Sequence, residues 1–308
     1  MIYGYICLSL AIFCGLVKGF CGKKTSNLIA TIKDSLYIST IRMLICCVFG
    51  VLFVTITTGS ISNIATDFRV ILLSLAGAIG LSAFIISWLF CVKRGAYMLT
   101  NVFLTLGTIV PILFSALFYG ETIKPIQIVG LIVLLVAVWV MCTYNHSLKG
   151  KKLGVISILL LLICGLSEGL SSFCQKSFTV LFGVGQMAIV DTPIDISVYN
   201  FYTYVFSSII IGIAFLIFKS KDKQSALVPV KSFVIYVVVM AFALFFNTYF
   251  MTSASVELPA SLLYPISQGG ALVLSTIMCS IFFNEKINIK CIIGIVLTFV
   301  ALIMINVI

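Results

Sequence analysis

The sequence predicts an all-α membrane protein with ten transmembrane helices, arranged as two inverted five-helix repeats around a central cavity. Three observations support this prediction: an apolar composition, a series of apolar runs of membrane-spanning length, and motifs of the first half that recur in the second. The 308 residues are 62% hydrophobic and 9% charged, which leaves too few charges for the exterior of a soluble protein. Lipid is therefore expected to cover most of the surface.

Ten apolar stretches are each long enough to cross a hydrocarbon core of about 30 Å as a helix. Polar gaps with Gly, Pro, Asn or Lys separate them, and the connections 22–35 and 176–197 are longer than the others. The first stretch has no basic segment before it and no small-residue cleavage site after it, so we expect a retained helix rather than a signal peptide. The expected spans are 1–21, 36–57, 70–91, 95–119, 123–143, 153–175, 198–218, 230–252, 258–283 and 287–307.

Two motifs of the first half return in the second half. CGLVKG at 14–19 returns as CGLSEG at 164–169, and FYGE at 118–121 returns as FFNE at 282–285. Repetition on this scale indicates two structural units of five helices each. Since five is odd, the second unit enters the membrane from the opposite side to the first, which is typical of carriers that expose one midplane site alternately to either side.

The motifs FYGE and FFNE each end a helix rich in small residues and precede a Gly-containing helix. They resemble the corresponding parts of the ten-helix EamA-type members of the drug/metabolite transporter (DMT) superfamily, and YPISQG at 264–269 resembles the start of the ninth helix of such carriers. The resemblance covers nearly the whole chain, with repeats at 1–147 and 148–308. It implies that helices one to four and six to nine surround the cavity, that helices five and ten are peripheral, and that the protein is a carrier, with export as the expected direction.

The formal net charge of +10 could indicate binding to nucleic acid, but the basic residues are spread over short gaps between apolar runs instead of forming one patch. No nucleic-acid partner is expected. With ten spans, 16 of the 19 Lys and Arg residues fall at odd-numbered connections, so the positive-inside rule predicts that both termini lie outside. The resemblance implies the opposite orientation. The expected location is the cell (plasma) membrane, crossed many times.

No metal, cofactor or catalytic site is expected. Most of the eleven cysteines lie within apolar runs, where Cys behaves as a small apolar residue. The single histidine, His146, lies in a connection, so a zinc or haem site lacks ligands. The sequence has no Gly-rich nucleotide-binding motif with Lys, so the energy for transport is expected to come from a gradient of a proton or another coupling ion.

Glu168 is the leading candidate for a substrate-binding residue. It lies about 15 residues into its expected span, or about 22 Å along a helix. An ionised side chain there costs at least about 2.5–3.5 kcal/mol unless it meets water, a base or a proton. Its expected role is to hold the ammonium group of a substrate or to couple transport to a proton. A structural hydrogen bond between helices is the alternative.

Four further charged residues are assigned roles by their positions. Arg42, near the start of the second span, resembles a basic position of the family and is expected to clamp a carboxylate in a bidentate manner, or else to anchor the helix at the membrane surface. Lys18 is the repeat counterpart of Glu168, but it lies near the end of its expected span, so we expect its side chain to reach the headgroups. Glu121 and its counterpart Glu285 are expected to be structural.

Further polar side chains in four spans are expected to line the cavity, or else to form hydrogen bonds between helices, which contribute about 0.6 kcal/mol each. These residues are Tyr97 and Asn101 on the fourth helix, Asn200, Thr203 and Tyr204 on the seventh, Asn247 on the eighth, and Tyr264, Ser267 and Gln268 on the ninth. Pro111, Pro259 and Pro265 are expected to kink helices in a way that gates could use.

The sequence favours a secondary transporter of a small polar metabolite such as an amino acid, because Arg42 and Glu168 together would suit the two charges of a zwitterion. The alternatives are a multidrug or organic-cation carrier, a lipid-linked flippase of the same fold, and a channel. A membrane-embedded enzyme is the least favoured class, because the carboxylates are scattered and no serine has a histidine partner within a span. The expected assembly is a monomer or a homodimer.

Overall fold

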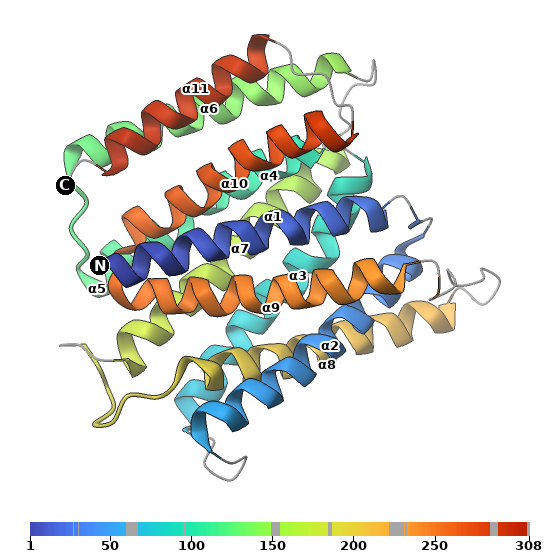
Figure 1. Ribbon diagram of the computed structural model, residues 1–308, viewed down its shortest axis with the longest axis vertical. Helices are drawn as coiled ribbons and strands as arrows, with labels where there is room; N and C mark the ends of the chain where they lie inside the picture. The colour runs from blue at the N-terminus through green and yellow to red at the C-terminus, as the bar shows by residue number, and fades with distance from the viewer. Residues whose placement is uncertain are drawn as a thin grey trace.

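The computed structural model is an all-helical bundle, as the composition predicts (Figure 1). It describes residues 1–26, 28–29, 31–59, 67–94, 97–148, 155–183, 187–221, 231, 233–283 and 289–306. The described residues form eleven α-helices. The helices are α1 (Ile2–Ser26), α2 (Ile32–Thr58), α3 (Phe68–Arg94), α4 (Tyr97–Gly107), α5 (Ile109–Tyr119), α6 (Pro125–Leu148), α7 (Val155–Phe182), α8 (Ile196–Lys221), α9 (Val234–Glu257), α10 (Ala260–Phe283) and α11 (Ile289–Asn306).

Seven helices of the described chain are long and apolar enough to cross a membrane by length and composition. They are α1, α2, α3, α7, α8, α9 and α10. Three shorter apolar helical segments lie at Phe103–Tyr119, Pro125–Ala137 and Ile292–Ile305. The chain is therefore a multi-pass membrane protein, since a bundle with this many apolar helices requires lipid around it.

The expected fourth span, 95–119, consists of two helices rather than one. Helix α4 ends at Gly107 and α5 begins at Ile109. Pro111 has no N–H group and cannot donate to the carbonyl of Gly107, so the hydrogen-bonding ladder is interrupted there. Thr108 keeps helical backbone angles, with φ −64° and ψ −21°. The interruption therefore changes the hydrogen bonding of this span while the chain continues in a helical course.

Glycines allow α7 to pack closely against α4 and α5. A Cβ atom on Gly165 would overlap the carbonyl oxygen of Phe103, and one on Gly169 would overlap the carbonyl oxygen of Gly107. These two glycines flank Glu168 in the repeated CGLSEG motif. The motif therefore fixes the distance between helices at the level of Glu168.

The helices form pairs across the bundle (Figure 1). Helices α6 and α11 pack against each other at one side, where the Gln127 side-chain amide donates to the carbonyl of Ile305 over 3.1 Å. Helices α2 and α8 pack together at the other side. Helices α1, α3, α7, α9 and α10 lie between these pairs, with α4 beside α10 and α7. The centre of the molecule is thus enclosed by helices that carry polar residues.

Helices α1 and α10 begin at one end of the bundle, where α9 and α11 end; we call this the N-terminal end (Figure 1). The N-terminal ammonium of Met1 forms an ion pair with Glu257 over 2.6 Å. Carboxylates also accept hydrogen bonds from helix starts at this end. Asp67 accepts from the backbone N–H of Arg69, and Asp195 from that of Ser197, each over 2.8 Å. Acidic residues therefore gather where helix N-termini need acceptors.

Candidate functional site

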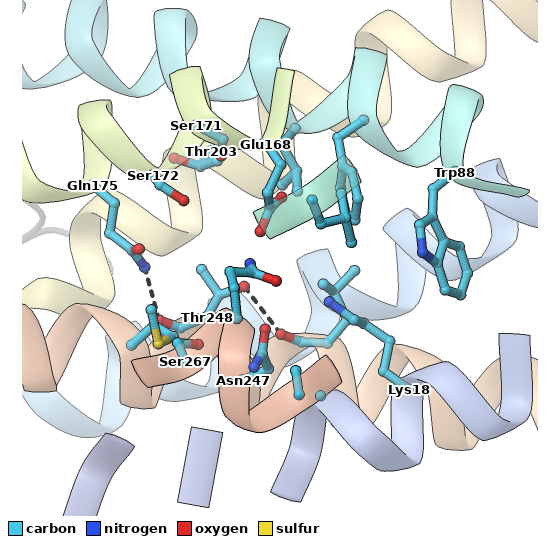
Figure 2. A pocket seen from close by; sticks show the side chains of 18 of the residues that line it. Lys18, Trp88, Glu168, Ser171, Ser172, Gln175, Thr203, Asn247, Thr248 and Ser267 are labelled. Carbon is cyan, nitrogen blue, oxygen red and sulfur yellow. Dashed lines mark hydrogen bonds between the residues drawn. The ribbon is translucent and has the colours of Figure 1, made fainter. Parts of the chain in front are cut away.

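A cavity of about 90 Å³ lies in the middle of the bundle, and seven helices contribute residues to its wall: α1, α3, α4, α7, α8, α9 and α10. This space is large enough for several water molecules, since one water needs about 10–15 Å³ on the same measure. Polar side chains approach it from both sides in Figure 2. The site is therefore an internal polar cavity in a membrane protein.

Glu168 enters the cavity from α7 (Figure 2). It is near the middle of the 28-residue helix Val155–Phe182. The neighbouring side chains Leu166 and Leu170 are 58% and 40% exposed on the outside of the bundle. Because lipid surrounds that outer face, the orientation of α7 directs its one carboxylate away from hydrocarbon and toward the polar interior.

Lys18 enters the same cavity from α1 (Figure 2). Its Nζ atom lies 5.6 Å from the centroid of the Phe84 ring, within the range of a cation–π interaction. The prediction that Lys18 reaches the headgroups is therefore wrong. Helix α1 continues to Ser26, so about 12 Å of helix separates Lys18 from its end. Of the described residues that line the cavity, Lys18 and Glu168 are the two that carry a charge.

Five of the polar residues named from the sequence also line the cavity: Asn101, Thr203, Asn247, Ser267 and Gln268. Two of them are held by hydrogen bonds to other helices. The Asn101 amide donates to the hydroxyl of Ser275 on α10, and the Asn247 amide donates to the carbonyl of Ala11 on α1, each over 2.7 Å. The cavity wall is thus positioned by contacts that also join helices.

Three other predicted residues are buried behind the wall rather than in it. The Tyr264 hydroxyl donates to the carbonyl of Ser172 over 2.6 Å, and the Tyr204 hydroxyl donates to that of Leu244 over 3.4 Å. Asn200 is 1% exposed and accepts a 3.5 Å hydrogen bond from Thr252. Their predicted role as cavity-lining groups is wrong, because packing turns them toward neighbouring helices. Tyr97 begins α4, but its side chain lies outside the described residues.

Arg42 also lies outside the cavity. It is 1% exposed, and its Nη1 atom donates to the sulfur of Met240 on α9 over 3.4 Å. Among the described residues, the Nε and Nη2 atoms have no hydrogen-bond partner. Arg42 therefore does not line the central cavity, because its guanidinium is directed into the α2–α9 contact. That it clamps a substrate carboxylate stays a prediction. Lys18, and not Arg42, supplies the positive charge beside Glu168.

The sequence analysis missed several cavity residues that follow Glu168 on α7. Ser171, Ser172 and Gln175 stand three, four and seven residues after it, so they share its helix face. Figure 2 shows them on the same side of the cavity. The Gln175 amide donates to the Thr252 hydroxyl over 2.7 Å. A search for polar residues at helical spacing from Glu168 would have found this stripe.

Aromatic rings form another part of the wall that the sequence analysis did not identify. Phe84 and Trp88 contribute from α3, and Tyr199 contributes from α8. Figure 2 shows the Trp88 indole at the end of the cavity next to Lys18. Aromatic faces attract cations, most strongly where water is excluded. The cavity thus combines a carboxylate with rings that suit a positively charged group.

A buried ion pair lies at the N-terminal end of the bundle, one residue beyond Gln175. The Lys176 ammonium is 3.1 Å from a carboxylate oxygen of Glu121, and it donates to the carbonyls of Ser255 and Leu258 over 3.0 and 2.9 Å. The other carboxylate oxygen of Glu121 accepts from the backbone N–H of Ala260 over 2.8 Å. We call this group the Lys176–Glu121 junction. It joins α7, the end of α9, the start of α10 and the α5–α6 connection.

The Lys176–Glu121 junction gives Glu121 the structural surroundings expected from the sequence, at the start of a helix. That helix is α10, however, and not the helix that follows Glu121 in the chain. Its repeat counterpart, Glu285, lies outside the described residues.

The fold and the polar cavity define a multi-pass helical membrane protein with an internal site. Comparison with known proteins identifies curated relatives of part of the chain. The chain is 35% identical over 108 residues to the quaternary ammonium compound-resistance protein QacH of Staphylococcus saprophyticus, and 34% identical over 109 residues to QacC of Staphylococcus sp. (strain ST827). Each match covers 34% of this chain, and 92% and 94% of the respective relative. The chain belongs to the family of these quaternary ammonium compound-resistance proteins.

Two further comparisons bear on the fold. A solved crystal structure matches with a TM-score of 0.66, over 97% of this chain and 96% of its own length, at 16% sequence identity. This similarity shows a shared fold along almost the entire chain and carries no information about substrate. No protein-family model matches the sequence.

Proposed function

We propose that this protein is a secondary transporter that moves a small organic solute with a cationic group across the membrane by alternating access. The observation that carries the proposal is the Glu168 carboxylate in an internal cavity of a multi-pass membrane bundle. Placing a carboxylate in a membrane interior costs free energy, so such a residue is expected to have a function. A cationic group would compensate its charge, and the aromatic rings nearby would add a favourable interaction.

The names of the relatives favour a solute with a quaternary ammonium group over a polar metabolite without one. QacH and QacC are named for resistance to quaternary ammonium compounds. A quaternary ammonium group cannot donate hydrogen bonds, so recognition depends on charge and on aromatic faces. Glu168, Phe84 and Trp88 provide both around one cavity. We assign efflux as the direction, by analogy with resistance.

The pairing of helices supports two inverted repeats of five spans, with α4 and α5 together as the fourth span. If each span is replaced by its counterpart in the other half, the pair α1–α9 becomes α7–α3, and the pair α2–α9 becomes α8–α3. All four of these helix pairs are in contact. Three further contacting pairs consist of a span and its own counterpart, so the replacement leaves them unchanged: α2–α8, α6–α11 and α4–α10. Such symmetry suits a carrier whose two halves exchange conformations. The proposed units remain 1–147 and 148–308, as in EamA-type carriers.

Coupling to a gradient would follow from the single carboxylate. Glu168 can bind a proton or a cationic group, but it cannot fully bind both at once. Competition between the two would let an inward proton gradient drive the solute outward. The proposed location is the plasma membrane, with both termini outside according to the distribution of basic residues.

Transport by purified protein in liposomes tests this proposal. Counterflow of radiolabelled tetramethylammonium should be saturable for the wild type, and Glu168→Gln should reduce its rate at least about 100-fold, the range expected when an essential charged contact is lost. Glu257→Gln is the matched control, because Glu257 pairs with the N-terminus at the surface. Equal counterflow by folded Glu168→Gln protein and wild type would refute the proposal.

A further inference from the structure

We infer that the cavity selects solutes with both a cationic and an anionic group, with Glu168 holding the first and Lys18 holding the second. This inference rests on the proposed function, since it names the substrate class of the same site. It also revises the basis of the zwitterion hypothesis, in which Arg42 supplied the positive charge.

The two charged residues occupy equivalent positions in the repeated motif. Lys18 is the fifth residue of CGLVKG, and Glu168 is the fifth residue of CGLSEG. The structure brings both to one cavity from different helices, α1 and α7 (Figure 2). A positive and a negative group therefore face a common space of about 90 Å³, which gives that space no net formal charge.

Lys18 and Glu168 attract each other electrostatically without forming an ion pair. The ion pairs that the structure describes involve other residues. The described interaction of the Lys18 ammonium is with the Phe84 ring. Both side chains are partly accessible from the cavity. The gap between the two charges is thus a place where a guest with two opposite charges could meet both.

Lys18 is also the group that would discriminate between guests. A simple cation bound at Glu168 would leave the Lys18 ammonium beside a like charge in a site of low dielectric, where repulsion is strong. A carboxylate on the same guest would remove this repulsion and gain a charge-assisted hydrogen bond. We expect a guest with both charges to bind about 10-fold to 100-fold more tightly than a simple cation.

The surroundings of Lys18 keep it available for this role. Gly15, one turn earlier on α1, leaves room for the Asn247 amide, which is bound to the carbonyl of Ala11. This contact fixes α1 against α9 at the level of the cavity. Arg42 cannot take over, because its guanidinium is turned toward Met240 in α9. Lys18 is therefore the basic side chain that this arrangement presents to a guest.

A matched pair of ligands tests the inference. Choline and glycine betaine share the trimethylammonium group, but one carries a hydroxyl and the other a carboxylate. The chain has two tryptophans: Trp88 in the cavity wall and Trp139, which is 68% exposed on α6. Trp139→Phe should therefore leave Trp88 as a fluorescence reporter of the site. Dissociation constants for the two ligands would be measured in this background.

Glycine betaine should bind at least 10-fold more tightly than choline in the Trp139→Phe background. Lys18→Gln should abolish this difference while choline binding is kept or strengthened, and Glu168→Gln should weaken both ligands. Lys24→Gln is the matched control on the same helix, because Lys24 contacts the rings of Phe20 and Phe283 instead of the cavity.

Two results would overturn the inference while leaving the proposed function intact. One is choline binding as tightly as glycine betaine or more tightly. The other is an equal loss of both ligands in folded Lys18→Gln protein, which would make Lys18 a structural residue. Failure of both ligands to bind, together with no tetramethylammonium counterflow, would overturn the proposed function as well.

Discussion

Removal of the ammonium group from the Lys176–Glu121 junction should destabilise the folded bundle. The change Lys176→Met keeps the length and the apolar stem of the side chain, so it deletes mainly the charge and its hydrogen bonds. The side chain of Lys176 is 6% exposed and that of Glu121 is 18% exposed. The variant therefore leaves a carboxylate without its partner in a site that water reaches poorly.

The expected loss follows from the contacts that Lys176 makes. Removing one partner from a buried ion pair costs about 3–5 kcal/mol. That range includes the donor lost by the carbonyls of Ser255 and Leu258, each worth about 0.5–1.5 kcal/mol. Glu121→Gln should cost less, because its amide oxygen can still accept from the backbone N–H of Ala260.

Equilibrium unfolding in mixed detergent micelles, followed by far-ultraviolet circular dichroism, measures these differences. The double variant with Lys176→Met and Glu121→Gln should lose less free energy of unfolding than the two single variants lose in sum. The expected difference, which is the coupling energy, is about 0.5–3 kcal/mol. Arg69→Gln is the control, because Arg69 pairs with Asp67 at a site where 54% of its side chain is exposed. No measurable change is expected there.

The reasoning would be refuted if Lys176→Met lowered the free energy of unfolding by less than about 1 kcal/mol, the level of an exposed pair. Strict additivity of the two single changes would refute the ion pair as well, even if each change alone were destabilising.

Three more outcomes follow from the structure. Gly165→Ala should lower the thermal unfolding temperature strongly, since its Cβ would overlap the backbone of α4, whereas Gly212→Ala, whose Cβ would have no described atom within 4 Å, should raise it slightly. Arg42→Met should keep or raise that temperature and leave counterflow intact, because two guanidinium nitrogens lack partners in the part of the chain that the structure describes. Cysteines at the exposed positions of Asp191 and Lys219 should react with an impermeant thiol reagent from outside and from inside the cell, respectively.

Most of the fold could be predicted from the sequence, because a run of about 20 apolar residues that crosses lipid must form a helix to satisfy its backbone hydrogen bonds. The expected spans 1–21, 36–57 and 70–91 each fall within one helix, or nearly so. Hydropathy alone could not place the interruption in 95–119, although Pro111 was expected to disturb a helix in this span. The interruption depends on a single missing hydrogen bond, which is a local backbone property.

The side chains of the site were harder to predict, because hydropathy does not give the rotation of a helix about its axis. Helix α8 illustrates the problem. Asn200, Thr203 and Tyr204 were expected in the cavity, whereas the structure has Thr203 there together with Tyr199. Tyr199 and Thr203 precede Asn200 and Tyr204 by one position each, which is a rotation of about 100° about the helix axis. Only the packing of α8 against its neighbours decides between them.

The direction of Glu168 on α7 could be predicted, because the neighbouring residues restrict the rotation of this helix. Its lipid-facing residues are apolar, including Leu166 and Leu170, so a carboxylate between them can have one acceptable direction. Lys18 lacked this constraint, since a lysine can extend toward either the headgroups or the interior. Its true direction depended on the length of α1, which continues to Ser26 beyond the expected end of the span.

The contrast between Lys18 and Glu168 has a consequence for any carrier built from two related halves. If the repeat had kept glutamate at both equivalent positions, the cavity would contain two carboxylates and would favour cations or protons in pairs. Lysine in the first copy instead gives one charge of each sign around the same space. Backbone symmetry and charge asymmetry are thus separable: the glycines of CGLVKG and CGLSEG can preserve the geometry of the halves while the fifth residue sets which guest the cavity accepts. Exchange of Lys18 for glutamate should then convert preference for glycine betaine into preference for choline, without a change in helix packing.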